Sequence, residues 1–557
     1  MAKTFTENLP QLREPGALGI VALPMTIKHA IHLTRLLGER YLWVDSLCIA
    51  QDDNEFLMDH LGRMASIFAH AQAVIIPVDG ANADSGICGL KGTPAEVARH
   101  LTQEKIPFGD MSLLVRTEMG HRRHGIGLPV EKAYFHRGWT FQEYLFARRR
   151  ICFENNSVWF QCCSSTMYED HSHPDLPDKQ RDFLLDVGYP SLTVYSKLVG
   201  NFNQRQLSYP QDCLSAMAGM LSCYSRVFTG GFLCGLPEMF FDAVLLWQPA
   251  ADLVRRKPVE TSMKHEAIIH IPTWSWAGWQ GRIDFAGWAT GNDFVAACSG
   301  WIASTSQQTF PITKWYTSAD SSGKTGKRKI DVEWAAWRDR YRDPGQELPA
   351  GWTRSERRRD DILTIETPPD GFGDFLYQHE SCGARFWYPL PLLNPTYSYH
   401  PRSSSVSEAI YLLGSVQTAY LSISGAEWMH CIGTSMSDNP QVAHVSLYTS
   451  QKDWAGVLRL HSRDYFKMRK SNPAMSLVDV QLIAISRGFI PNDLPYNVPE
   501  IAEYAREERP KHGDKYEFYN VMWISWREGV AYRQGLGRVD KNRWESLEVS
   551  MIDVVLG

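Results

Sequence analysis

The chain has 557 residues, of which 44% are hydrophobic and 21% are charged, and its formal net charge is −5. This is the composition of a globular protein, and it excludes a disordered or fibrous chain. The length exceeds what one compact core usually holds and predicts two or three domains. The small acidic excess and the short, isolated basic runs disfavour a nucleic-acid partner.

Cysteine usage and apolar patterning favour a cytoplasmic protein. The 11 cysteines are an odd number and form no CxxC pair, so we expect reduced, mostly buried thiols rather than a disulfide framework. Residues 1–13 are polar and carry no apolar signal core. The most apolar long window, residues 228–247, contains three glycines, one proline and two acidic residues, and is a poor membrane span. We therefore expect no membrane partner.

The first segment predicts alternating helices and strands. A helix is expected after Pro24 and is stopped by Gly38. The apolar run 41–44 predicts a buried parallel strand, and the helix after Asp52 or Asp53 leads to a second strand over 73–78. This order indicates an α/β domain with a parallel sheet.

Further along, residues 140–148 predict a helix, and 150–153 and 158–162 predict two strands joined by a turn at Asn155–Asn156. The pattern then becomes mixed helix and loop, while the last third has short apolar or alternating runs and is predicted to be β-rich. We expect three regions: 1–163, 164–300 and 301–557 with polar insertions.

Three segments resemble the fungal heterokaryon-incompatibility (HET) domain: residues 41–53 (YLWVDSLCIAQDD), the 84–90 loop (DSGICGL) and residues 137–143 (RGWTFQE). The resemblance implies a signalling protein of non-self recognition that triggers growth arrest or programmed cell death, with protein partners or self-association. The family usually opens with a strand carrying a Ser-Tyr-x-Trp-Gly-like motif, and residues 1–20 contain no such motif. This departure leaves a truncated, inactive paralogue as an alternative.

The HET domain is itself distantly similar to the Toll/interleukin-receptor (TIR) domain, a flavodoxin-like α/β fold. Some TIR domains cleave NAD with a glutamate in a Trp-x-x-x-Glu arrangement, and Trp139 and Glu143 have this spacing. The resemblance therefore implies a catalytic Glu143 and substrate-binding roles for Asp45 and Trp139. NAD would be the substrate, and neither a cofactor nor a metal would be required.

Each of these residues also has a purely structural interpretation. Glu143 could form an ion pair with Arg137 or Arg148, or it could cap a helix and interact favourably with its dipole. Asp45 could form a cap or a local turn through hydrogen bonds with nearby backbone amides. The acidic group Asp52, Asp53 and Glu55 is interpreted as a helix start rather than a metal site. Four further groups are interpreted as structural: Cys48 with His60 and His70, the loop histidines His121 and His124, the Trp274, Trp276 and Trp279 cluster, and the incomplete glycine motif at 535–537.

Two functions of different class follow. In the first, the domain is an NAD glycohydrolase that uses Glu143. In the second, it is a non-enzymatic module that self-associates and recruits partners. A cleft containing both Trp139 and Glu143 would favour the enzyme, and a Glu143 salt-bridged to arginine would favour the module.

Overall fold

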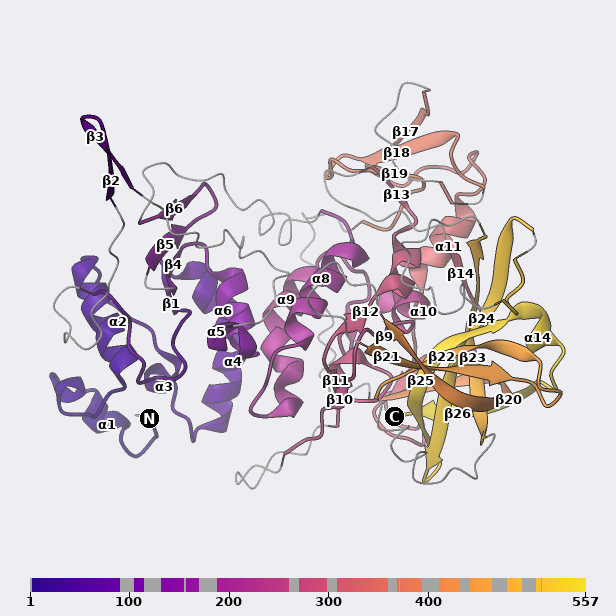
Figure 1. The fold of residues 1–557 in the computed structure, drawn as a ribbon, viewed down its shortest axis with the longest axis horizontal. Helices are drawn as coiled ribbons and strands as arrows, with labels where there is room; N and C mark the ends of the chain where they lie inside the picture. Colours follow the sequence, from indigo (N-terminus) through magenta and orange to yellow (C-terminus); the bar gives the residue numbers. More distant parts are fainter. Residues whose placement is uncertain are drawn as a thin grey trace. The chain divides into compact units, whose positions relative to one another are not determined.

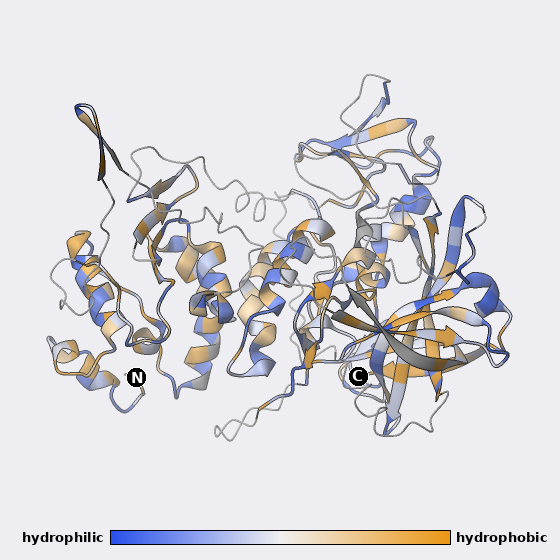
Figure 2. Ribbon diagram, viewed as in Figure 1, coloured by the Kyte–Doolittle hydropathy of each residue, from blue (hydrophilic) through white to orange (hydrophobic). Residues whose placement is uncertain are grey.

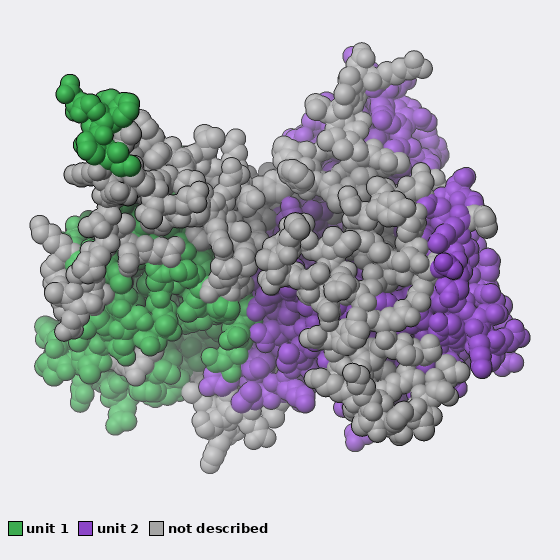
Figure 3. All heavy atoms as spheres, viewed as in Figure 1, with its two compact units in different colours: residues 1–186, 205–208, 215–220 green, residues 187–204, 209–214, 221–557 purple. Residues whose placement is uncertain are grey.

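The chain is described by a computed structural model that covers residues 3–90, 105–114, 132–154, 157–169, 188–259, 270–297, 308–358, 368–369, 371–392, 410–430, 441–462, 478–492, 507–511 and 513–557. The chain forms two compact units, which Figure 3 colours separately. Unit 1 contains residues 1–186, 205–208 and 215–220, and unit 2 contains residues 187–204, 209–214 and 221–557. The three predicted regions stay a prediction, and the predicted turn at Asn155–Asn156 lies outside the described residues.

Unit 1 is built around a four-stranded sheet with the order β1–β4–β5–β6 (Figure 1). Its strands are β1 (Val74–Pro77), β4 (Arg150–Glu154), β5 (Ser157–Gln161) and β6 (Thr166–Tyr168). The β1–β4 pair is parallel, and the other two pairs are antiparallel. The predicted α/β domain is therefore confirmed, as are the strands predicted over 73–78, 150–153 and 158–162. The sheet was predicted to be parallel, but it is mixed and has one parallel pair, β1–β4.

The strand predicted over residues 41–44 is wrong. These residues lead directly into the short helix α3 (Asp45–Cys48), and Tyr41 is 85% exposed. Among the described strands, β1 pairs with β4 alone. Because a strand needs a hydrogen-bonded neighbour for its backbone groups, an apolar run without one takes an irregular path. Trp43, which lies within residues 41–44, packs edge-on against Phe68 with 5.7 Å between the ring centroids.

Helices cover both faces of this sheet. On one face, Leu33 of α2 (Met25–Leu36) packs with Ile151 and Phe153 of β4. On the other face, the Arg150 guanidinium lies 4.0 Å from the ring centroid of Tyr144 in α6 (Thr140–Phe146). Alternate residues of β4 thus point to opposite helical layers, as the strand period of two requires.

The predicted helix limits agree with the observed ones. Helix α2 ends before Gly38, whose φ is 74°. Helix α4 (Asn54–His70) packs on α6, and the Asp53 side chain caps it by accepting a hydrogen bond from the Phe56 amide at 3.0 Å. The remaining elements of unit 1 are α1 (Leu9–Leu12), η1 (Ala17–Gly19), β2 (Lys105–Phe108), β3 (Met111–Leu114) and α5 (Ala133–His136).

Unit 2 contains a ten-stranded sheet that closes on itself because β20 pairs with both β21 and β23. Figure 2 shows hydrophobic residues along its strands. The predicted β-rich C-terminal part is confirmed. The strands are β14 (Gln308–Pro311), β15 (Tyr316–Ser318), β16 (Arg328–Lys329), β20 (Tyr411–His430), β21 (Gln441–Tyr448), β22 (Trp454–Leu460), β23 (Val478–Pro491), β24 (Lys515–Arg527), β25 (Val530–Asp540) and β26 (Ser550–Leu556).

The glycine motif at 535–537 belongs to this sheet and not to a nucleotide site. A Cβ at Gly537 would lie 1.9 Å from the Val457 carbonyl oxygen of the neighbouring strand β22. Only glycine permits this close approach of two backbones.

The tryptophan cluster lies in the core of unit 2, as predicted, although not on a strand. Trp274 and Trp276 are fully buried. Trp274 lies in a turn, and Trp276 begins the 3₁₀ helix η6 (Trp276–Gly278). The indole nitrogens of Trp274 and Trp276 donate to backbone carbonyls, which satisfies the polar atom of each ring.

The other described elements are α8 (Leu192–Asn203), η3 (Pro210–Cys213), η4 (Ser215–Met217), α9 (Ala218–Tyr224), β7 (Phe232–Leu233), β8 (Leu236–Pro237), η5 (Glu238–Phe240), α10 (Phe241–Val244), β9 (Gln248–Pro249), β10 (Val254–Arg255), β11 (Trp279–Gln280), β12 (Ile283–Asp284), η7 (Ala286–Asn292), β13 (Val295–Ala297), α11 (Glu333–Arg340), β17 (Trp352–Glu356), β18 (Phe375–His379), β19 (Arg385–Phe386) and α14 (Lys541–Glu545). Within the described ranges, no helix is both long and apolar enough to cross a membrane.

Candidate functional site

The 137–143 motif forms the entry into α6, and most of its residues hold this helix in place. The Thr140 hydroxyl donates to the Tyr134 carbonyl at 2.6 Å, and Gly138 leaves no room for a side chain because a Cβ would lie 2.4 Å from Leu207. The Gln142 side chain is fully buried and accepts a hydrogen bond from the Gly219 amide at 3.1 Å. The motif therefore fixes α6 against residues 205–208 and 215–220 of the same unit.

Glu143 belongs to the same motif, but its side chain does not anchor α6 through a hydrogen bond to the backbone of any described residue. It lies in the first turn of α6, is half-buried and accepts a hydrogen bond from the Tyr134 hydroxyl at 3.4 Å. Burial raises the pKa of Glu143 from 4.5 to about 7, against the lowering effect of the Arg137 charge. Near neutral pH this carboxyl group therefore exchanges its proton readily, which suits acid–base work.

The charge of Asp45 also raises the pKa of Glu143. The structure thus brings together two carboxylates from motifs that are far apart in the sequence. Asp45 is exposed at the first position of α3, where its Oδ1 atom accepts a hydrogen bond from the Ser46 amide at 2.7 Å. The local turn predicted as an alternative for Asp45 is present, and it coexists with the proximity to Glu143.

Trp139 precedes α6 as its N-cap residue and is half-buried. Within the described ranges, no hydrogen bond or ring contact joins it to Glu143, so the structure places the two residues on one helix without bringing them into contact. The ion pair that would make Glu143 purely structural, with Arg137 or Arg148, is also not found among the described residues.

Two neighbours of Glu143, Tyr134 and Arg205, could not be identified as site residues from the sequence. Tyr134 is 7% exposed, and burial raises its pKa well above the ordinary value. Arg205 is 3% exposed, donates to the Thr140 hydroxyl at 3.1 Å and has its pKa lowered by burial to about 10. Neither residue belongs to the quoted motifs, and only the fold brings Arg205 to α6.

Of the other acidic group, Asp53 and Glu55 lie at a helix start, as predicted, whereas Asp52 binds the N-terminal segment instead. Asp53 caps α4, and Glu55 follows it in the first helical turn. The Asp52 carboxylate accepts hydrogen bonds from both the amide and the hydroxyl of Thr6, and these bonds lower its pKa. Over the residues that the structure describes, no cluster of three acidic, histidine or cysteine side chains is arranged to hold a metal ion.

Among the described residues, Cys48 forms no hydrogen bond with His60 or His70. His60 and His70 each contact a carbonyl of their own helix through Nδ1, at 2.9 and 2.8 Å. Cys48 is exposed, which contradicts the expectation of a buried thiol at this position. The histidines His121 and His124 lie outside the described residues.

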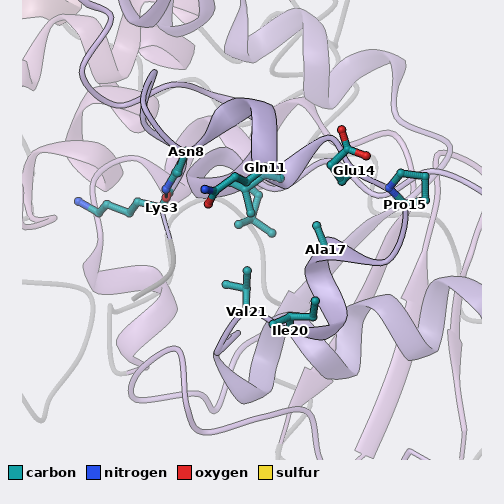
Figure 4. A pocket seen from close by; sticks show the side chains of 10 residues that line it. Lys3, Asn8, Gln11, Glu14, Pro15, Ala17, Ile20 and Val21 are labelled. Carbon is teal, nitrogen blue, oxygen red and sulfur yellow. Dashed lines mark hydrogen bonds between the residues drawn. The ribbon is translucent and has the colours of Figure 1, made fainter.

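Two of the pockets in the described part of unit 1 bear on ligand binding. The larger, of about 560 Å³, is enclosed by the N-terminal residues and by Leu47 of α3; Figure 4 shows Gln11 on one wall and Ile20 and Val21 on the opposite wall. The smaller, of about 150 Å³, lies at the ends of β1 and β4. Neither of these two pockets is lined by Glu143 or Trp139.

The N-terminal part of the chain matches the family described as "Heterokaryon incompatibility protein (HET)" over residues 6–143. The chain thus contains a HET domain over this range, which includes Asp45, Trp139 and Glu143.

Over 138 residues the chain is 29% identical to "Heterokaryon incompatibility protein 6, OR allele" of Neurospora crassa, an alignment that covers 20% of this chain and 20% of the relative. The chain therefore spans about a fifth of the length of the curated relative it matches. No solved structure matches the chain.

Proposed function

We propose that this chain is a cytoplasmic incompatibility-signalling protein whose HET domain triggers growth arrest or programmed cell death by hydrolysing the nicotinamide–ribose bond of NAD. We also propose that unit 1 is a TIR-like, flavodoxin-type domain. The observation that supports the enzymatic role is the environment of Glu143, whose pKa is raised to about 7 by burial and by the nearby Asp45.

The chemistry requires a negative group near the sugar. The nicotinamide of NAD carries a positive charge, which passes to the ribose as the glycosidic bond breaks and nicotinamide leaves with the electron pair. A carboxylate stabilises such an oxocarbenium-like ribose, as in glycoside hydrolysis. Water then attacks the ribose, and its released proton is accepted by a base. The positively charged nicotinamide ring of NAD, placed beside Glu143 and Asp45, would favour the ionised form of Glu143 that this step requires.

The test compares the full-length chain with Glu143→Gln in a fungal host, measuring intracellular NAD and viability after induction at matched protein level. We expect the wild type to deplete NAD and kill, and Glu143→Gln to lose at least about a hundredfold in the rate of NAD loss. Glu55→Gln is the matched control, because Glu55 is also a first-turn glutamate but is exposed and structural. Killing by both proteins without NAD loss would contradict the hydrolase.

One observation favours the second candidate, a self-associating recruitment module. Several apolar side chains near the N-terminus are exposed, with Ile20 at 90% and Tyr41 at 85%. A contiguous exposed apolar patch commonly marks a protein-binding surface, and this candidate requires these side chains to form one. Under this alternative, Ile20→Ser with Tyr41→Ser would abolish killing, whereas Glu143→Gln would leave it unchanged.

A further inference from the structure

Cys162 and Cys163 are the one pair of adjacent cysteines in the sequence, and they lie in the turn between β5 and β6. The Cys162 amide donates to the Ser165 carbonyl at 3.0 Å, which closes the turn. Both thiols are free, Cys163 is exposed and Cys162 is partly exposed. The turn therefore presents two sulfur atoms on neighbouring residues where a dissolved reagent can reach them.

The turn favours the ionised form of one of these thiols. A hydrogen bond from the Ser164 amide lowers the pKa of Cys162, against the opposing effect of burial. Hydrogen bonds from Ser165 and the charge of Arg149 lower this pKa further, and the Cys162 Sγ and Ser165 Oγ atoms lie 3.8 Å apart. Because the thiolate is the reactive form of cysteine, Cys162 is the nucleophile of the pair and Cys163 is the second thiol beside it.

Other described thiols lack one or both of these properties. Burial raises the pKa of the buried Cys152, Cys213 and Cys234 thiols, which makes them poor nucleophiles at neutral pH. Cys48 is exposed, but the sequence places no cysteine next to it. Cys48 is therefore an internal reference for an accessible thiol without an adjacent cysteine.

The covalent geometry makes a disulfide between the two sulfurs possible and easy to reduce. Adjacent Cα atoms are about 3.8 Å apart across a trans peptide, so rotation of the side chains can bring the sulfurs together. Most disulfides join Cα atoms that are about 4.4–6.8 Å apart, so a bond between adjacent cysteines is strained. Strained or exposed disulfides are the labile ones. A bond at this turn therefore suits a reversible modification and not the permanent cross-linking of the fold.

We propose that this pair is a modification site for hydroperoxides, at which Cys162 is oxidised first and Cys163 then closes a vicinal disulfide. The site goes beyond the proposed reaction at Glu143, and neither proposal rests on the other.

The reaction balances with hydrogen peroxide as the oxidant. The Cys162 thiolate attacks one peroxide oxygen, the O–O bond breaks, and hydroxide leaves and takes up a proton to form water. Cys162 is then a sulfenic acid, which condenses with a thiol. The Cys163 sulfur attacks the Cys162 sulfur, and the hydroxyl group leaves as water with the Cys163 proton. The two thiols thus lose two electrons and two protons, and one hydrogen peroxide becomes two water molecules.

The test uses the reduced full-length chain with hydrogen peroxide as the probe. Digestion after glutamate gives a peptide, residues 155–169, that contains both cysteines of the pair and separates them from Cys152. We expect mass spectrometry to show that this peptide loses two hydrogens, resists alkylation, and recovers both thiols after addition of glutathione. Cys48→Ser should leave these results unchanged, because Cys48 takes no part in the reaction.

Two serine variants test the order of events. Cys163→Ser should stop at the sulfenic acid of Cys162, which dimedone traps, and Cys162→Ser should form sulfenic acid in this peptide at least about threefold more slowly. Dissolving Cys163→Ser in urea should also slow the labelling of Cys162 at least about threefold, because unfolding removes the hydrogen bonds from Ser164 and Ser165.

The proposal is overturned by any of three results. These are no vicinal disulfide at peroxide doses that oxidise Cys48, dimedone labelling of Cys162 in Cys163→Ser that is no faster than labelling of Cys48, or a Cys162 rate that unfolding leaves unchanged. None of these measurements involves NAD, so failure at this site leaves the Glu143 proposal standing, and failure of the Glu143 proposal leaves this one standing.

Discussion

At the scale of single residues, Glu143 differs from its neighbours in the motif. The side chains of Thr140 and Gln142 form hydrogen bonds with backbone groups. Glu143 instead accepts a hydrogen bond from the Tyr134 hydroxyl at 3.4 Å, and its pKa is raised. Because burial disfavours its charged form, this carboxyl group lowers the stability of the folded protein once it ionises. Residues that lower stability are common at sites that are kept for function.

This cost predicts a pH-dependent effect of Glu143→Gln on stability. Between about pH 4.5 and 7 the folded state binds more protons than the unfolded chain, because the folded pKa is raised from 4.5 to about 7. The contribution of Glu143 to the free energy of unfolding therefore falls as pH rises through this window. We expect Glu143→Gln to be more stable than the wild type at pH 8 by about 1–2 kcal/mol, after allowance for solvent screening, and equally stable at pH 4.

The measurement is urea unfolding of both proteins at the two pH values, with Glu55→Gln as the exposed control. A Glu143→Gln protein that is less stable than the wild type at pH 8 would show that Glu143 is held by a favourable charge interaction and is structural.

At the scale of elements, α6 depends on segments that follow it by many residues. The buried Gln142 amide donates to the Ser215 carbonyl at 3.3 Å and accepts from the Gly219 amide at 3.1 Å. Arg205 binds the start of the helix at Thr140. With only seven residues, α6 is too short to be stable by itself, so these contacts set the position of Glu143.

Gln142→Ala is therefore expected to destabilise the protein by about 2–4 kcal/mol, because it removes a buried side chain and leaves two backbone groups without partners. Thermal and urea unfolding measure the loss. Gln204→Ala, at an exposed glutamine, gives the background effect of the same substitution and should change stability by less than about 0.5 kcal/mol. An equally small effect of Gln142→Ala would contradict the anchoring role.

At the scale of the whole molecule, the compact unit that holds the HET sheet is not continuous in sequence. Unit 1 takes in residues 205–208 and 215–220 in addition to the N-terminal part. A chain that ends at the sequence-predicted boundary of residue 163 would lack both Arg205 and Gly219. The folding unit is thus larger than the motifs that identify it.

We expect residues 1–163 expressed alone to be less stable than residues 1–224, which retain the segments that bind α6. Limited proteolysis and thermal unfolding of the two fragments would measure this difference. Equal protease resistance and equal Tm values would show that the 205–220 contacts are dispensable.

The sequence by itself determined the family and the order of most elements of the HET domain, because turn residues, helix caps and apolar periodicity are local signals. Asp53 at the start of α4 and Gly38 after α2 are examples. It also identified Asp45 and Glu143 as residues of interest, through two ordered motifs.

Only the tertiary structure decided which residues surround Glu143, and it changed the strand prediction for residues 41–44. Whether an apolar run forms a strand depends on a pairing neighbour supplied from elsewhere in the chain. The pKa of a carboxyl group depends on burial and on charges in space, and the Asp45 and Arg205 that act on Glu143 come from distant segments. No local pattern encodes those distances, since long-range packing sets them.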